Sequence, residues 1–131
     1  MKASHLLVGV LSVLAFLATG LYMRANFPAL YADNEALRYI YRANHIYLLL
    51  ASLVNIALGV YLVAPKSGWR ALLSRVGSGL VLLAPFVLCY AFFVEAPKAS
   101  PERLFTALGV VLVSLGVVAQ LPCYRGSRAL S

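Results

Sequence analysis

A short polar stretch between two apolar runs holds the side chains best able to bind a ligand. Glu35, Arg38 and Arg42 are three and four residues apart, so a helix places them on one surface. Asn44 and His45 follow directly. Two arginines beside an amide and an imidazole can hold a phosphate, a carboxylate or a lipid headgroup through charge-assisted hydrogen bonds. We interpret Arg38, Arg42, Asn44 and His45 as a candidate site for an anionic amphiphile; the alternative is that both arginines reach bulk headgroups or pair with nearby carboxylates.

The same stretch resembles a motif of membrane enzymes. Tyr41-Arg42-Ala43-Asn44-His45 is similar to the Arg-Ala-x-x-Asn type motif that begins the second helix of the membrane-associated glutathione and eicosanoid enzymes, four-span proteins of similar length. The similarity covers only these residues, its Asn is out of register, and the acidic residue that follows in the family is absent. The resemblance implies a membrane enzyme as an alternative function, and no catalytic residue is carried over from it.

Other ligand chemistry has no pattern in the sequence. His5 and His45 begin the first and second apolar runs on opposite sides, about 25–30 Å apart at 1.5 Å per residue, so one haem cannot bind both. No group of Cys, His or carboxylates has metal-ligand spacing, and no hydrolase or phosphate-binding motif occurs. We therefore predict no cofactor, no metal site and no catalytic residue.

The composition is that of a membrane protein. Hydrophobic residues make up 63% and charged residues 11%, against roughly 45–50% and about 25% in soluble domains. The apolar runs cover residues 5–23, 44–64, 71–94 and 104–122. Each has close to the roughly 20 residues that a helix needs to cross a bilayer. A cleaved signal peptide is the alternative for the first run, but that run is long enough to span.

These runs predict the fold. We expect residues 1–131 to form a single domain, an all-α integral membrane protein whose four transmembrane helices make an antiparallel bundle. Asp33 or Asn34 can cap an amphipathic helical extension that leads into the second span.

Each predicted span carries small and weakly polar side chains along one face. In lipid such residues collect where helices touch. We assign to the bundle interior Ser12, Thr19, Ser52, Asn55, Ser78 and Gln120. Asn55 lies near the middle of its span, where an unpaired amide costs several kcal/mol, so we expect Ser12, Ser78 or a lipid or cofactor atom to bond to it. Pro85 leaves the carbonyl of Val81 without its helical partner.

Charge indicates orientation. The side that holds both termini carries six Lys and Arg and no acid, and the other carries five with all four acids. The positive-inside rule therefore favours cytoplasmic N- and C-termini in a multi-pass protein of a bacterial inner membrane.

The expected function is that of a non-catalytic accessory, assembly or interaction subunit. A proton-coupled transporter requires a charged residue near the centre of a span, and no span has one. The sequence therefore favours a subunit over a transporter of small solutes or lipids, which is the second alternative. The net charge of +7 forms no run of five or more basic residues, so we expect no nucleic-acid partner. The expected partners are the bilayer, an anionic lipid, and another membrane protein or a second copy of the chain.

Overall fold

The chain folds almost entirely into helices. The computed structural model describes residues 1–63, 65, 67–98 and 102–128, which contain no strand. Its elements are α1 (Lys2–Ala25), α2 (Phe27–Tyr31), α3 (Glu35–Tyr61), α4 (Gly68–Val94), the 3-10 turn η1 (Ala96–Lys98) and α5 (Leu104–Arg128). The helices α1, α3, α4 and α5 are each long and apolar enough to cross a membrane. This confirms the prediction of an all-helical chain with four such helices.

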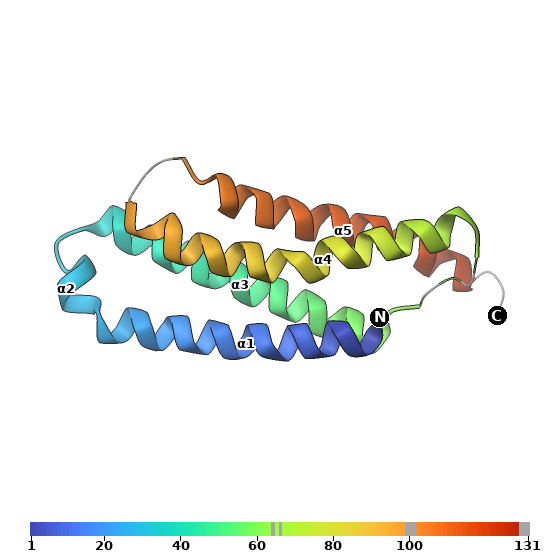
Figure 1. Ribbon diagram of the computed structural model, residues 1–131, viewed down its shortest axis with the longest axis horizontal. Coiled ribbons are helices and arrows are strands. Elements are labelled where there is room, and N and C mark those ends of the chain that lie inside the picture. Colours follow the sequence, from blue (N-terminus) through green and yellow to red (C-terminus); the bar gives the residue numbers. More distant parts are fainter. Residues whose placement is uncertain (64, 66, 99–101, 129–131) are drawn as a thin grey trace.

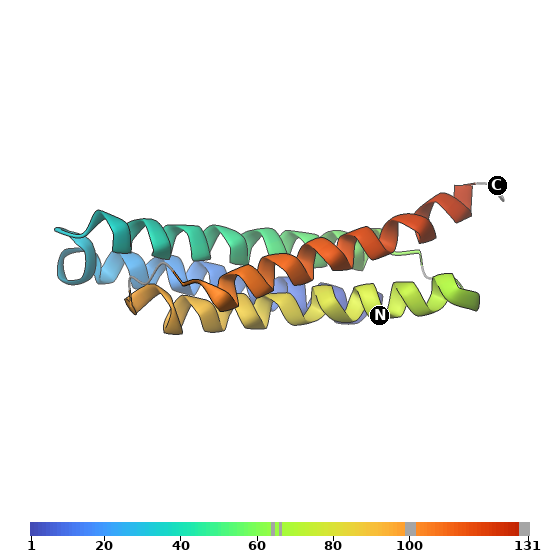
Figure 2. The ribbon, with the colours of Figure 1, turned by 90° about the horizontal axis from the view of Figure 1, so that it is seen from above.

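The four long helices lie side by side (Figure 1). α1 packs closely with α3 and α4 packs closely with α5, while α3 and α4 join the two pairs. The short elements α2 and η1 lie at one end, here called the α2 end. The N-terminus and the start of α4 lie at the other, here called the N-terminal end. Figure 2 shows α5 at an angle to α4, and the two helices stay in contact toward the N-terminal end, where Cys123 Sγ lies 3.3 Å from the carbonyl oxygen of Arg70.

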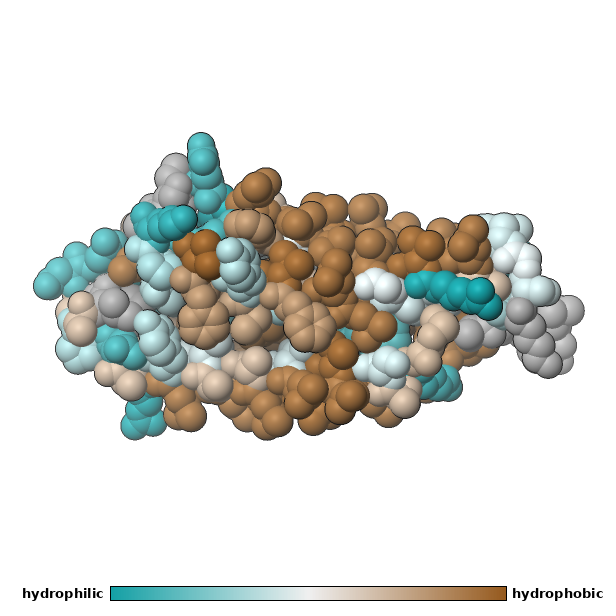
Figure 3. Space-filling model, viewed as in Figure 1, coloured by the Kyte–Doolittle hydropathy of each residue, from teal (hydrophilic) through white to brown (hydrophobic). Residues whose placement is uncertain are grey.

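The outer surface is apolar along most of its length. Figure 3 shows hydrophobic side chains along the middle of one face and hydrophilic side chains mostly toward the ends. On α1, Leu7, Leu14 and Leu21 are each more than half exposed. An apolar surface this extensive exceeds what soluble monomers leave uncovered.

Glycines bring the paired helices into close contact. A Cβ added to Gly116 of α5 would lie 2.5 Å from Val81 Cγ2 and 2.8 Å from the carbonyl oxygen of Gly77. On α1, a Cβ added to Gly9 would lie 2.7 Å from Ile56 Cγ1. Small residues at such positions let helix backbones approach, which is how packing stabilises helices in lipid.

The starts of α3 and α4 have local causes, and the start of α3 agrees with the predicted helical extension before the second span. α3 begins with its polar extension because Asn34 Oδ1 accepts a hydrogen bond of 3.0 Å from the N–H of Leu37. α4 begins at Gly68, whose φ of +80° favours glycine.

Two other helix ends differ from the predicted span limits. α3 ends at Tyr61, and the predicted last residue of that span, Ala64, lies outside the described residues. α5 continues past the predicted limit at Pro122, because a proline removes one helical hydrogen bond without stopping this helix.

Candidate functional site

A cavity at the α2 end is lined by arginines from two helices. It measures about 130 Å³, and its walls are Met23 and Arg24 at the end of α1, Phe27 of α2, and Arg38 and Arg42 of α3. Arg38 and Arg42 are one helical turn apart and therefore share a face of α3. Arg24 joins them because the chain turns back through α2. We call this hollow the arginine cavity.

The arginine cavity carries a net positive charge. No acidic residue is among the described residues that line it. Arg38 Nη2 donates a hydrogen bond of 3.3 Å to Glu35 Oε1, but the Glu35 side chain is 91% exposed. Such exposed pairs contribute little, about 0–1 kcal/mol, because water screens them. Three arginines against one solvated carboxylate therefore leave the surroundings of this hollow positively charged.

A second hollow shares the side chain of Arg42 with the arginine cavity. It measures about 340 Å³ and is lined by Tyr39, Arg42, Ala43, Ile46 and Tyr47, all on α3. Arg42 lines both hollows, so they meet at this residue. From Tyr39 to Tyr47 the helix rises about 12 Å at 1.5 Å per residue. We call this apolar and aromatic hollow the α3 groove.

Asn44 points away from the arginine cavity into a polar cluster that joins three elements. Its Oδ1 accepts hydrogen bonds from Arg103 Nη2 and, at 2.8 Å, from Thr106 Oγ1. The Oε2 atom of Glu95, a residue that is 7% exposed, lies 2.6 Å from Thr106 Oγ1. Its carboxylate also accepts the backbone N–H groups of Phe105 and Thr106. We call Asn44, Glu95, Arg103 and Thr106 the polar clasp.

The polar clasp provides hydrogen-bond acceptors for the first N–H groups of α5. The first N–H groups of a helix have no partner within it, and the helix dipole favours an anion there. Glu95, just after α4, supplies that anion to the first turn of α5. Asn44 ties the same turn to α3. The clasp therefore holds α3, α4 and α5 together at the α2 end.

His45 joins α3 to α1. Its ring stacks on Phe16, with ring centroids 4.0 Å apart. Because the Thr19 hydroxyl donates to the carbonyl of Phe16, His45 Nδ1 donates to Thr19 Oγ1 at 3.0 Å. A Cβ added to Gly20 would lie 3.1 Å from His45 Cε1, so the glycine makes room for the ring. The structure therefore separates the four predicted binding residues: Arg38 and Arg42 stay together, and the other two bond between helices.

The side chains assigned to the bundle interior are buried in the structure, namely Ser12, Thr19, Ser52, Asn55, Ser78 and Gln120. Gln120 joins α5 to α4, because its Nε2 donates to the carbonyl of Ser74 at 2.9 Å and to Ser78 Oγ at 3.2 Å. Ser74 Oγ donates in return to Gln120 Oε1 at 3.1 Å. Ser52 instead bonds within its own helix, to the carbonyl of Leu48 at 2.7 Å.

Asn55 has partners that differ from those expected. Its Nδ2 donates to the carbonyls of Ala51 and Val81, each at 3.0 Å. Its Oδ1 accepts a bond of 2.8 Å from His5 Nδ1. The expectation of a serine or lipid partner is wrong, because Pro85 leaves the Val81 carbonyl free and α1 begins early enough to bring His5 within reach. Asn55 thus ties α1, α3 and α4 together.

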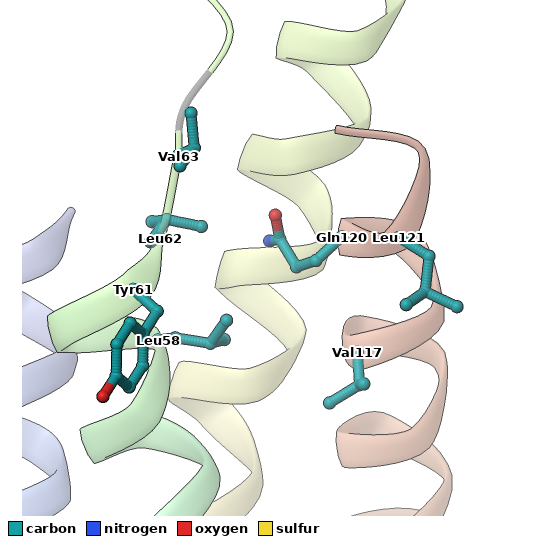
Figure 4. A pocket seen from close by; sticks show the side chains of 7 residues that line it. All are labelled: Leu58, Tyr61, Leu62, Val63, Val117, Gln120 and Leu121. Carbon is teal, nitrogen blue, oxygen red and sulfur yellow. The ribbon is translucent and has the colours of Figure 1, made fainter. Parts of the chain in front are cut away.

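A third hollow lies between α3 and α5 near the N-terminal end (Figure 4). It measures about 190 Å³ and is lined by Leu58, Tyr61, Leu62, Val63, Val117, Gln120 and Leu121. Leu58 and Val117 point toward one another across it. The amide of Gln120 is already bonded to Ser74 and Ser78 of α4. We call this hollow the apolar cavity.

The sequence analysis missed Arg24 and most of the polar clasp. Arg24 follows the first apolar run on the same side as Arg38 and Arg42, which is the signal that could have added it to the site. Glu95 and Arg103 flank the connection between the last two runs. A charged side chain next to a short connection between two helices needs a partner near the same end of the bundle. This requirement could have identified Glu95 and Arg103.

Comparisons with known proteins give no relative to argue from. No family model, no curated protein and no solved structure matches the chain. Within the part of the chain that the structure describes, no three His, Cys, Asp or Glu side chains are grouped so that they could hold a metal ion.

Proposed function

We propose that this chain is an integral protein of a bacterial inner membrane. In this proposal α1, α3, α4 and α5 form an antiparallel transmembrane bundle, the N- and C-termini are cytoplasmic, and the α2 end lies outside. The length and apolar surface of the four helices support the membrane location. The excess of Lys and Arg beside the termini supports the orientation.

We further propose that the protein is a non-catalytic accessory or interaction subunit that holds an anionic amphiphile at its α2 end. The convergence of Arg24, Arg38 and Arg42 on one cavity carries this proposal. Hydrogen bonds to charged groups contribute about 1.5–3 kcal/mol each, so three arginines give an anion a strong preference over a neutral group. Arginines that only reached bulk headgroups would have no reason to converge from α1 and α3.

The bundle interior supports a binding role over a catalytic one. Asn55 and Gln120 use their amide groups to bond between helices. His45 is likewise engaged with Thr19 and Phe16. The hydrogen bonds of these three side chains therefore stabilise the packing of the helices.

Cysteine labelling tests the orientation. In a background with Cys89→Ser and Cys123→Ser, we expect Asp33→Cys to react with a membrane-impermeant maleimide in cells whose outer membrane alone is opened. Ser67→Cys, at the other end of the bundle, should react only after the inner membrane is lysed. Both positions are exposed. The opposite labelling pattern would overturn the proposed orientation.

Lipid preference tests the function. The protein is placed in nanodiscs that contain equal amounts of phosphatidylglycerol and phosphatidylcholine, and the lipids that remain bound after extraction are counted. We expect an excess of the anionic lipid, which the double variant Arg38→Gln, Arg42→Gln loses. The matched control is Arg70→Gln, Arg75→Gln, two exposed arginines of α4 near the N-terminal end. An equal loss in both variants would reject the arginine cavity as the site.

A further inference from the structure

We infer that the ligand of the arginine cavity is a lipid with a phosphomonoester headgroup, whose phosphate lies among Arg24, Arg38 and Arg42 and whose hydrocarbon chain lies in the α3 groove. This inference rests on the proposed function and narrows it to one headgroup chemistry.

Charge favours a phosphomonoester over other anionic heads. The three arginines that line the cavity, together with the Glu35 side chain bonded to Arg38, carry a net charge of +2. A phosphomonoester carries about −1.5 to −2 at pH 7, whereas a phosphodiester or a carboxylate carries one negative charge. A phosphomonoester also presents three terminal oxygens, which match the forked donors of several guanidinium groups.

Size favours the same headgroup. The arginine cavity measures about 130 Å³, and Met23 and Phe27 form its apolar walls. A bare phosphate places all its polar atoms against the arginines. Among the described residues, the walls other than the arginines offer no hydrogen-bond partner to the glycerol or choline that a diester adds.

The α3 groove indicates that the phosphate belongs to a lipid. It runs along α3 from Tyr39 to Tyr47 and includes Arg42. Ile46 is 60% exposed and Tyr39, at the mouth of the groove, is 70% exposed. Tyrosines and arginines of this kind are typical of the level where headgroups meet hydrocarbon. A lipid whose phosphate is held by Arg42 therefore has an apolar path for its chain on the same helix.

The test compares three lipids with the same acyl chains in nanodiscs, namely phosphatidic acid, phosphatidylglycerol and phosphatidylcholine. Stepwise binding constants are taken from native mass spectra. We expect phosphatidic acid to bind about tenfold more tightly than phosphatidylglycerol, which corresponds to about 1.4 kcal/mol. The variant Arg24→Gln, Arg38→Gln, Arg42→Gln should lose this difference, and Arg70→Gln, Arg75→Gln should keep it.

The outcomes separate this inference from the proposed function. Equal binding of phosphatidic acid and phosphatidylglycerol, both tighter than phosphatidylcholine, would overturn the inference and leave the proposed function standing. Equal binding of all three lipids would overturn both.

A second arm distinguishes a lipid from free phosphate. We expect millimolar inorganic phosphate to leave bound phosphatidic acid in place, and Ile46→Ala to weaken phosphatidic acid by about twofold to fivefold, as expected for a partly exposed methylene contact. Leu53→Ala, an exposed leucine of α3 beyond the groove, is the matched control and should change nothing. Full displacement by inorganic phosphate, with no effect of Ile46→Ala, would overturn the inference in favour of a soluble phosphate.

Discussion

The arginine cavity and the apolar cavity lie toward opposite ends of the bundle and differ in what can fill them. The apolar cavity, of about 190 Å³, has walls of leucine, valine and tyrosine, and its one amide, on Gln120, is already bonded to α4. In a bilayer any acyl chain fills such a hollow equally well. The arginine cavity, of about 130 Å³, is lined by Arg24, Arg38 and Arg42, so a ligand there would meet positive charge. The difference teaches that, under the proposed function, selectivity resides at the α2 end.

The two ends also differ in how the helices are held. At the α2 end Glu95 and Asn44 fix the start of α5, and Tyr41 packs against Phe92 with ring centroids 5.1 Å apart. At the other end the apolar cavity lies between α3 and α5, and the Gln120 amide ties α5 to α4 (Figure 4). A cavity that selects a ligand requires side chains at fixed positions. The polar clasp fixes α3, which carries Arg38 and Arg42, against α4 and α5.

The largest expected effect comes from removing the charge of the arginine cavity. Changing Arg24, Arg38 and Arg42 together to Gln should weaken binding of an anionic lipid by about 1000-fold, since each of the three charge-assisted bonds contributes about 1.5 kcal/mol, or roughly tenfold. Titration in nanodiscs measures this. The double variant Leu58→Phe, Val117→Phe, which fills the apolar cavity, should leave the affinity unchanged. If filling the apolar cavity abolished binding, the anionic lipid would bind at the N-terminal end and not in the arginine cavity.

Helix packing gives the next effect. Gly116→Val should lower the free energy of unfolding by about 3 kcal/mol, because even a Cβ would lie 2.5 Å from Val81 Cγ2. Unfolding in mixed micelles with increasing dodecyl sulfate measures the change. Gly79→Ala is the matched control on α4, where an added Cβ meets nothing within 4 Å, and it should be neutral or slightly stabilising. If both variants behave alike, the described contact between α4 and α5 is wrong.

The polar clasp should contribute a smaller amount. Glu95→Gln should lower the free energy of unfolding by about 1–3 kcal/mol, because it removes the charge that accepts the first N–H groups of α5. The same unfolding assay applies. Glu35→Gln, a change of the same chemistry at a side chain that is 91% exposed, should shift stability by less than about 0.5 kcal/mol. Equal effects would mean that the clasp does not hold α5.

The smallest expected effect is on lipid binding, and it tests whether Glu35 competes with the ligand. Glu35→Gln removes the carboxylate that lies 3.3 Å from Arg38 and competes with the ligand for its guanidinium. We expect anionic lipid to bind about twofold to threefold more tightly, in line with the small contribution of an exposed ion pair. Weaker binding in this variant would show that Glu35 helps to form the site.

Much of the helical architecture could be predicted from the sequence, because four apolar runs of this length are typical of helices that can cross a bilayer. The start of α3 was predictable for a local reason, since Asn34 has the side chain of an N-cap. The end of α5 was not, because a proline inside a helix stops it in some contexts and not in others.

The candidate site was predictable only in part. The helical spacing of Arg38 and Arg42 placed them together, and both line the arginine cavity. Asn44 and His45 are near them in sequence, yet their positions around α3 turn them toward α5 and α1. Arg24 joins the site through the turn at α2, and no periodicity within one helix reports a contact between two helices. Asn55 shows the same limit, because its partners His5 and Val81 come from other helices.

Native mass spectrometry of the protein extracted from its own membrane in a mild neutral detergent tests the binding role of the three arginines most directly. The wild-type chain should carry an adduct with the mass of an anionic lipid. The adduct should persist in Arg70→Gln, Arg75→Gln and disappear in Arg24→Gln, Arg38→Gln, Arg42→Gln. A wild-type chain without an adduct, or the same adduct on the triple variant, would contradict the assignment of the arginine cavity as the functional site.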